Sequence, residues 1–100
     1  MIDSGEAERN LISSVLNVDD EVKKQIAIDT ISLSMISSAR NRELWTAIKE
    51  LSDNGDLVDV AALFGKLPHE IAYITEIYQE NVIHKWISSY VDRVKKCAYL

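Results

Sequence analysis

The sequence contains one cysteine, Cys97, so no intrachain disulfide can hold the chain together. A lone cysteine is typical of a protein that works in a reducing compartment. The first residues lack the positive start and apolar core of a signal peptide, and no apolar run approaches the roughly 18 residues that a membrane span needs. We therefore expect a cytoplasmic protein that makes no contact with a membrane.

Glycine and proline are also scarce, with 3 and 1 residues in a chain of 100. Because these residues interrupt regular structure, their scarcity favours helices over a meander of short strands. Apolar residues make up 47% of the sequence and charged residues 27%, as in an ordinary globular protein. We expect a single helical domain over residues 1–100, which is close to the commonest domain size.

The sequence lacks the residue arrangements that catalysis or cofactor binding requires. Gly65-Lys66 has neither the upstream glycine nor the following Ser or Thr of a phosphate-binding loop. The two histidines and the cysteine have no metal-ligand spacing. The acids at positions 53, 56 and 59 do not match a calcium loop, and helix capping explains them more simply. We expect no catalytic residue, no cofactor and no metal ion.

Negative charge exceeds positive charge, with a formal net charge of −5 and a pI of about 4.9. Because phosphate-backbone binding depends on Lys and Arg, this balance favours protein partners over DNA. Acids are concentrated in residues 1–21 and bases in the last stretch. That asymmetry fits either two solvated helix faces, which we favour, or a head-to-tail packing of domains.

Hydrophobic periodicity and capping residues predict an all-α, compact orthogonal bundle of about six helices. The expected helices are residues 5–17, a shorter one after Asp19-Asp20, 41–53, a short one between Asp59 and Gly65, 68–80 and 83–97. Residues 29–39 are rich in Ser and β-branched residues and have no strand partner, so we expect irregular chain with one helical turn near 33–36. Glu80-Asn81 is expected to mark the break between the last two helices.

The stretch 41–59 is expected to lie at the centre of the bundle. It combines an apolar helical stripe with Asn54-Gly55, a left-handed helix stop that glycine adopts without steric cost. Asp56 or Asp59 then caps the next helix.

The apolar stripes also predict which side chains are buried. The expected core is Leu11, Val15, Leu44, Trp45, Ile48, Leu51, Leu63, Ile74, Ile87, Tyr90 and Val94. The same stripes predict that the second helix buries Val22, Ile26 and Ala27, that the fifth buries Ile71, Ile77 and Tyr78, and that the last buries Ile83, Val91 and Ala98. Trp86 falls one residue off its stripe and Tyr99 follows the last helix, so a partner surface and a core position are about equally favoured for both.

Three motifs occur in a fixed order along the chain. In the first, Glu6-Ala7-Glu8 is followed by Leu11, Ile12, Val15 and Leu16. The middle motif consists of Asn41, Arg42, Leu44, Trp45, Ala47, Ile48, Glu50, Leu51, Gly55, Val58, Asp59, Leu63 and Leu67. The last motif consists of Tyr73, Ile74, Ile77, Ile87, Tyr90, Val91, Val94 and Lys95. In this order they resemble the N-terminal domain of DnaB-type replicative DNA helicases, over nearly the whole chain.

The resemblance implies a non-catalytic domain. In that family the motor is a separate domain with its own phosphate loop, which this sequence lacks. The N-terminal domains form a collar on a hexameric ring, usually as a trimer of dimers, and bind primase and in some systems a loader. The chain stops near where the family's helical hairpin begins, so we expect an excised fragment or a standalone homologue.

Several positions depart from the family pattern. Asn41 replaces a histidine, Met35-Ile36-Ser37 replaces Asp-Phe-Tyr, a Gly-Gly pair is absent, and the loop after Leu67 is shortened. We therefore expect a divergent member, of the kind that a phage or mobile element could encode.

Two other functions fit parts of the sequence. One is the helicase-binding domain at the end of bacterial primase, or a loader or inhibitor that imitates it. The other is a small DNA-binding domain that uses Lys85, Arg93, Lys95 and Lys96, although the net charge disfavours it.

Overall fold

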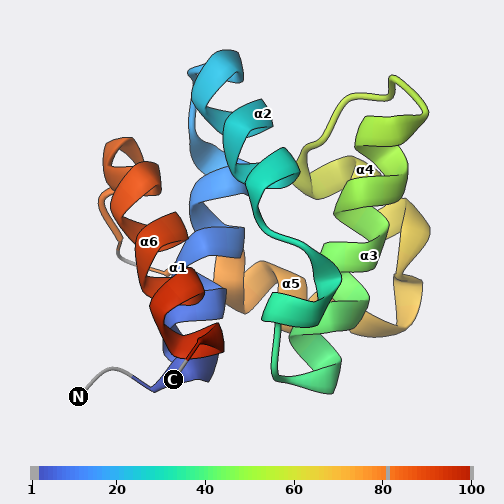
Figure 1. Ribbon diagram of the computed structural model, residues 1–100. Helices are drawn as coiled ribbons and strands as arrows, with labels where there is room; N and C mark the ends of the chain where they lie inside the picture. The colour runs from blue at the N-terminus through green and yellow to red at the C-terminus, as the bar shows by residue number, and fades with distance from the viewer. Residues whose placement is uncertain (1–2, 81, 100) are drawn as a thin grey trace.

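The computed structural model describes residues 3–80 and 82–99, and every regular element in that part of the chain is a helix (Figure 1). The α-helices are α1 (Ser4–Asn17), α2 (Glu21–Thr30), α3 (Ala39–Asp53), α4 (Val60–Lys66), α5 (Ile71–Tyr78) and α6 (Ile87–Ala98). Short 3-10 helices are η1 (Leu33–Met35), η2 (Pro68–Glu70) and η3 (His84–Trp86). The predicted all-α class and the helical turn near residue 33 are confirmed.

Helix α1 lies at the centre of the bundle, where it packs against α2, α3, α5 and α6 (Figure 1). Its buried apolar residues are Ala7, Leu11, Ile12, Val15 and Leu16. Helix α3 contacts α1, α2 and α4 but neither α5 nor α6 to a comparable extent. The expectation that residues 41–59 form the centre is therefore wrong, because α1 packs against more of the other helices than α3 does.

Side-chain caps fix the starts of α1, α2 and α3. Asp3 accepts a hydrogen bond from the amide of Gly5, and Asp20 accepts from the amides of Val22 and Lys23 at 3.1 Å each. The Ser38 hydroxyl accepts from the amide of residue 41 at 3.3 Å, which starts α3 at Ala39, two residues earlier than predicted. Each cap satisfies an amide that the helix itself leaves free.

The connection from α3 to α4 follows the predicted turn chemistry. Gly55 adopts φ 73°, the left-handed conformation that ends α3. Asp59, rather than Asp56, caps α4 by accepting from the amide of Ala62 at 2.8 Å. Gly65 does not end α4, because the helix continues to Lys66.

The last two helices bury fewer residues than the sequence predicts. On α5, Ile74 and Ile77 are buried but Ile71 and Tyr78 are exposed, since the helix begins only after η2. On α6, Ala98 is exposed, and Ile83 precedes η3 and is also exposed. The predicted break at Glu80-Asn81 includes Asn81, which lies outside the described residues.

Helix α2 buries Ala27 as predicted, but Val22 and Ile26 face outward, contrary to the prediction. Val22 is 70% exposed and Ile26 57% exposed, whereas Lys24 is buried together with Ala27 and Ile28. The Lys24 ammonium donates a hydrogen bond to the carbonyl of Val58 and lies 3.9 Å from Glu21. Because that carbonyl supplies a partner for the buried charge, Lys24 can replace an apolar residue on the inward face.

The residues predicted for the core are buried. Trp45 is among the largest side chains that are wholly enclosed, and every residue in the predicted set has little or no exposed surface: Leu11, Val15, Leu44, Trp45, Ile48, Leu51, Leu63, Ile74, Ile87, Tyr90 and Val94.

Candidate protein-binding site

A groove of about 500 Å³ opens beside Trp86, where α1 meets the segment that leads into α6. The side chain of Trp86 is 50% exposed and lies in the groove with the exposed Ile83. Tyr90 forms part of the groove wall, and its hydroxyl accepts a hydrogen bond from the amide of Ile83 at 3.2 Å. An exposed tryptophan in a hollow is the type of anchor that dominates protein interfaces.

Charges of both signs surround the apolar part of this groove. Arg9 on α1 lies 3.5 Å from the carboxylate of Glu80, and Glu6 and Arg93 also line the groove. Burial raises the pKa of Glu80 above its ordinary value, and the neighbouring Arg9 offsets part of that effect. The arrangement suits a protein surface with mixed polarity better than a strongly charged polymer.

Tyr99, the other predicted partner residue, lies at the far end of α6 and is 73% exposed. The 12-residue helix separates it from Trp86 by about 18 Å along the axis. Tyr99 lines a different hollow, with Asp92, Lys95 and Lys96. The two predicted contact residues therefore do not form one site.

A buried carboxylate, that of Glu8, connects α1 to the segment before α3. One oxygen accepts hydrogen bonds from the amide and hydroxyl of Ser37 at 2.7 and 2.8 Å. The other accepts from the amide of Ser38 at 3.3 Å and from the side-chain amide of Asn41 at 3.0 Å. The side chain of Glu8 is enclosed, and the Ser37 and Ser38 amides supply donors for its charge.

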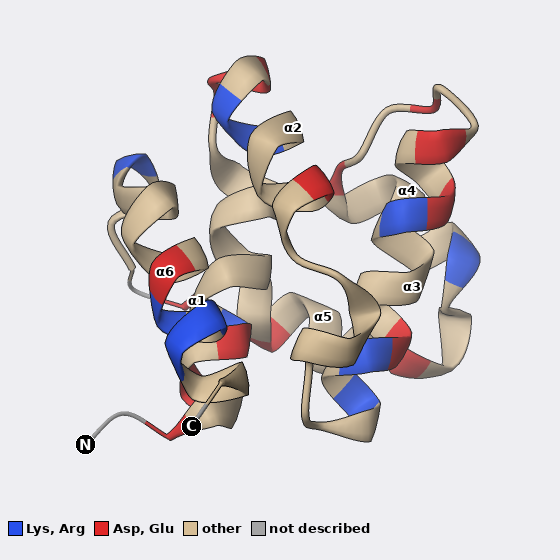
Figure 2. Ribbon diagram, in the orientation of Figure 1, with Lys and Arg blue, Asp and Glu red and all other residues tan. Residues whose placement is uncertain are grey.

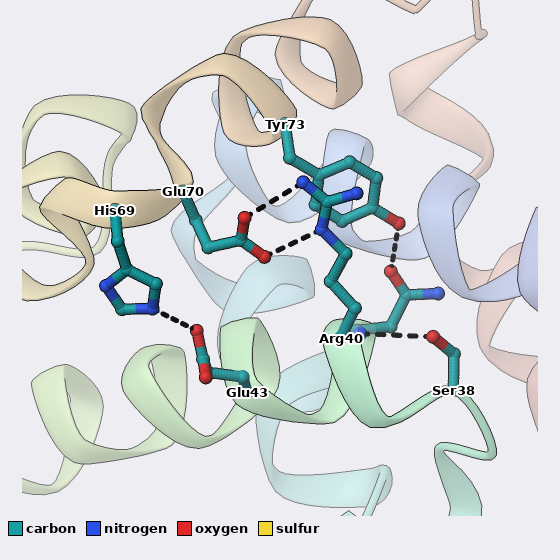
Figure 3. A network of polar contacts seen from close by, with 7 residues as sticks. Ser38, Arg40, Glu43, His69, Glu70 and Tyr73 are labelled. Atoms are coloured by element: carbon teal, nitrogen blue, oxygen red, sulfur yellow. Dashed lines mark hydrogen bonds and ion pairs between the residues drawn. The ribbon is translucent and has the colours of Figure 1, made fainter.

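The same network continues from α3 to α5. The side-chain oxygen of Asn41 accepts a hydrogen bond from the hydroxyl of Tyr73 (Figure 3). Burial raises the pKa of the Tyr73 phenol above its ordinary value. The guanidinium of Arg40 stacks on the Tyr73 ring, 3.8 Å from its centre. These contacts join three helices through polar groups that have partners.

Two side-chain contacts, one of them an ion pair, join α3 to η2 on the surface beside this network. Arg40 donates two hydrogen bonds to Glu70, at 2.7 and 2.9 Å, and His69 lies 2.7 Å from Glu43 (Figure 3). The hydrogen bonds from Arg40 lower the pKa of Glu70 below its ordinary value, and the same contact raises the pKa of Arg40. Figure 3 shows both pairs in the short space between α3 and η2.

The irregular segment 31–38 is held in place by side chains of α3. The Arg42 guanidinium donates to the carbonyl of Ile36 at 3.0 and 2.9 Å. The indole N–H of the enclosed Trp45 donates to the carbonyl of Ile31 at 2.9 Å. These bonds satisfy carbonyls that no helix or strand would otherwise pair.

The middle motif therefore has a structural explanation, and part of it has a signal in the sequence. Arg42 and Trp45 each donate to carbonyls of the chain that precedes α3, Glu8 of the first motif accepts from the same segment, and Asn41 donates to Glu8. That signal is the position of Glu8, which lies two residues after Glu6 and on the side of α1 that carries Leu11 and Ile12. No comparable signal in the sequence indicates that Lys24 is buried.

Two kinds of feature are absent from the part of the chain that the structure describes. Within 3–80 and 82–99, no three His, Cys, Asp or Glu side chains come together in a way that could hold a metal ion. In the same residues, no helix has the length and apolar character needed to cross a membrane.

Comparison with known proteins gives one match. The sequence matches the family described as DnaB-like helicase N terminal domain over residues 2–96. No curated protein and no solved structure matches the chain. The match spans almost the entire sequence, and the all-helical bundle agrees with it. The chain belongs to the DnaB-like helicase N-terminal domain family.

Proposed function

We propose that this chain is a protein-interaction and oligomerisation domain of a replicative DNA helicase, active in DNA replication in the cytoplasm. It forms one domain over residues 1–100 and contributes no catalytic group. In a full-length helicase it pairs with a second copy within the collar of a hexameric ring. It also binds primase or a helicase loader, and it makes no sequence-specific contact with DNA.

The family match over residues 2–96 carries this proposal. The fold adds support, because the motif residues that resemble the family hold the scaffold together and leave other surfaces free. Glu8, Arg42 and Trp45 are all engaged in internal hydrogen bonds. The exposed Trp86 groove is the surface that we assign to the second copy.

Binding to primase tests the partner half of the proposal. The purified chain is mixed with the primase encoded by the same genome, and sedimentation velocity is used to look for a complex. A complex with primase is expected. Binding to the assembled hexameric helicase instead, with no complex with primase, would show that the chain imitates a primase domain. Tight duplex DNA binding in a gel shift at low salt would favour the DNA-binding alternative.

A further inference from the structure

The outward face of α2 and the C-terminal half of α6 lie beside each other and carry exposed apolar and basic side chains. Helix α2 packs against α6, and a groove of about 210 Å³ between them is lined by Ile26 of α2 and Val91 of α6. Asp92 and Lys95 line both this groove and the hollow at Tyr99, so the two hollows lie next to each other. Val22 and Ile26 are exposed on α2, and Tyr99 stands at the other end.

The orientation of α2 makes this surface unusual. The helix buries a lysine and exposes two β-branched apolar side chains, Val22 and Ile26, one turn apart. This orientation is unfavourable in water, because it exposes apolar area that a rotated helix would bury. Neighbouring exposed apolar side chains beside a groove are the kind of feature that a partner can cover.

The charge on the rim opposes that of the whole chain. The residues that line the two hollows include Lys23, Lys95 and Lys96 against the single acid Asp92, whereas the chain has a net charge of −5. Among the described residues, no carboxylate forms an ion pair with any of these three lysines. Figure 2 shows basic residues in the first half of α2, next to the acids at its start, and basic residues on the last turns of α6. Lys95 and Lys96 also complement the dipole of α6, but that role does not explain Lys23 or the exposed Ile26.

We propose that this surface binds an acidic amphipathic helix of a partner protein. The apolar side of that helix lies along the groove between α2 and α6, and its acids meet Lys23, Lys95 and Lys96. Helix α6 spans about 18 Å, so a partner segment of roughly three turns matches its length. The inference rests on the proposed interaction function and names the chemistry of the partner. It uses a different surface from the Trp86 groove.

Two synthetic peptides of roughly four helical turns test the proposal. Both carry leucines at helical spacing; one has glutamates at the remaining positions and the other has lysines. Fluorescence anisotropy measures the affinity of the full chain for each labelled peptide. The glutamate peptide is expected to bind at least about tenfold more tightly than the lysine peptide. Its affinity should fall as salt is added.

Variants locate the contact on the α2–α6 surface. We expect Ile26→Ser and the double variant Lys95→Glu/Lys96→Glu each to lower the affinity for the glutamate peptide by about tenfold. All three side chains lie at the surface, so these variants should fold. Matched controls are Leu57→Ser, which removes another exposed apolar residue, and Lys66→Glu, which reverses a lysine on α4. Neither control should change the affinity.

Several results would overturn the proposal. These are equal binding of both peptides, no binding at millimolar concentration, or equal loss in the control variants. A single-stranded oligonucleotide that competes as well as the glutamate peptide would identify a nucleic-acid surface instead. Loss of self-association in Ile26→Ser would show that a second copy covers this face. Self-association that persists without peptide binding refutes this inference and leaves the proposed function standing.

Discussion

The carboxylate of Glu8 is the most highly connected polar group among the described residues. It accepts hydrogen bonds from Ser37, Ser38 and Asn41, and Asn41 in turn accepts from Tyr73. A buried carboxylate is stable only when donors replace the water that it has lost, and here backbone amides supply part of that replacement. Single side chains thus tie the start of α3 to both α1 and α5.

Replacing Glu8 should cost more stability than replacing its exposed neighbour. We expect Glu8→Ala to lower the free energy of unfolding by about 3 kcal/mol, because the Ser37 and Ser38 amides lose their acceptor. Urea denaturation followed by circular dichroism measures the change. The control Glu6→Ala, on an exposed side chain of the same turn, should stay within about 0.5 kcal/mol of the original. Equal effects for the two variants would show that Glu8 does not hold the segment.

Trp45 provides a second test at the residue scale. Trp45→Ala should destabilise the chain by roughly 3–5 kcal/mol, since it empties an enclosed site and leaves the Ile31 carbonyl unpaired. The half-exposed Trp86 is the matched control, and Trp86→Ala should change the thermal midpoint far less. A Trp45→Ala variant that melts with the original chain would contradict the internal position of this helix face.

At the scale of elements, polar side chains join the helices, and the junction of α3 with η2 depends on pH. Helix α3 meets η2 through Arg40 and Glu70 on the surface, whereas α2 meets the α3–α4 connection through buried Lys24. Since Arg40 lowers the pKa of Glu70, their contact is fully formed above the usual range of a glutamate. Its contribution to stability is lost as the pH falls through the lowered pKa of Glu70 in the folded chain.

The pKa of Glu70 reports directly on this junction. We expect Arg40→Gln to raise the pKa of Glu70 towards its ordinary value, because the hydrogen bonds from the guanidinium are the largest cause of the shift. Carbon NMR of the side-chain carboxyl across an acid titration measures the value. Lys66→Gln is the control, since Lys66 lies 3.2 Å from Glu50 and should leave Glu70 unchanged. An unchanged pKa in Arg40→Gln would show that the pair does not form in solution.

The sequence predicted the elements better than their orientation. Periodicity located the helices and the apolar core, since residues such as Leu44 and Ile48 recur at helical spacing. It misplaced Val22 and Ile26, because the burial of Lys24 depends on a carbonyl 34 residues away, which no local pattern reveals. The central position of α1 was missed for the same reason: packing with several helices is a property of the tertiary structure.

At the scale of the whole molecule, the binding surfaces were only partly predictable. The predicted last helix already places Trp86 near its start and Tyr99 beyond its end, but periodicity could not show that these two exposed residues line separate hollows. Nor could it show that Lys23 and Lys95, 72 positions apart in sequence, line one groove. A surface is formed by residues that the fold brings together, so its composition becomes visible only once the helices are placed.

Self-association of the purified chain tests the central claim most directly. Sedimentation equilibrium over increasing concentration should show a mass that rises from 11.3 kDa towards twice that value, and Trp86→Ala should suppress the rise. Tyr78→Ala, an exposed aromatic on α5 outside the groove, is the control and should associate like the original. A mass that stays at 11.3 kDa at the highest concentration would contradict an oligomerisation surface within these residues.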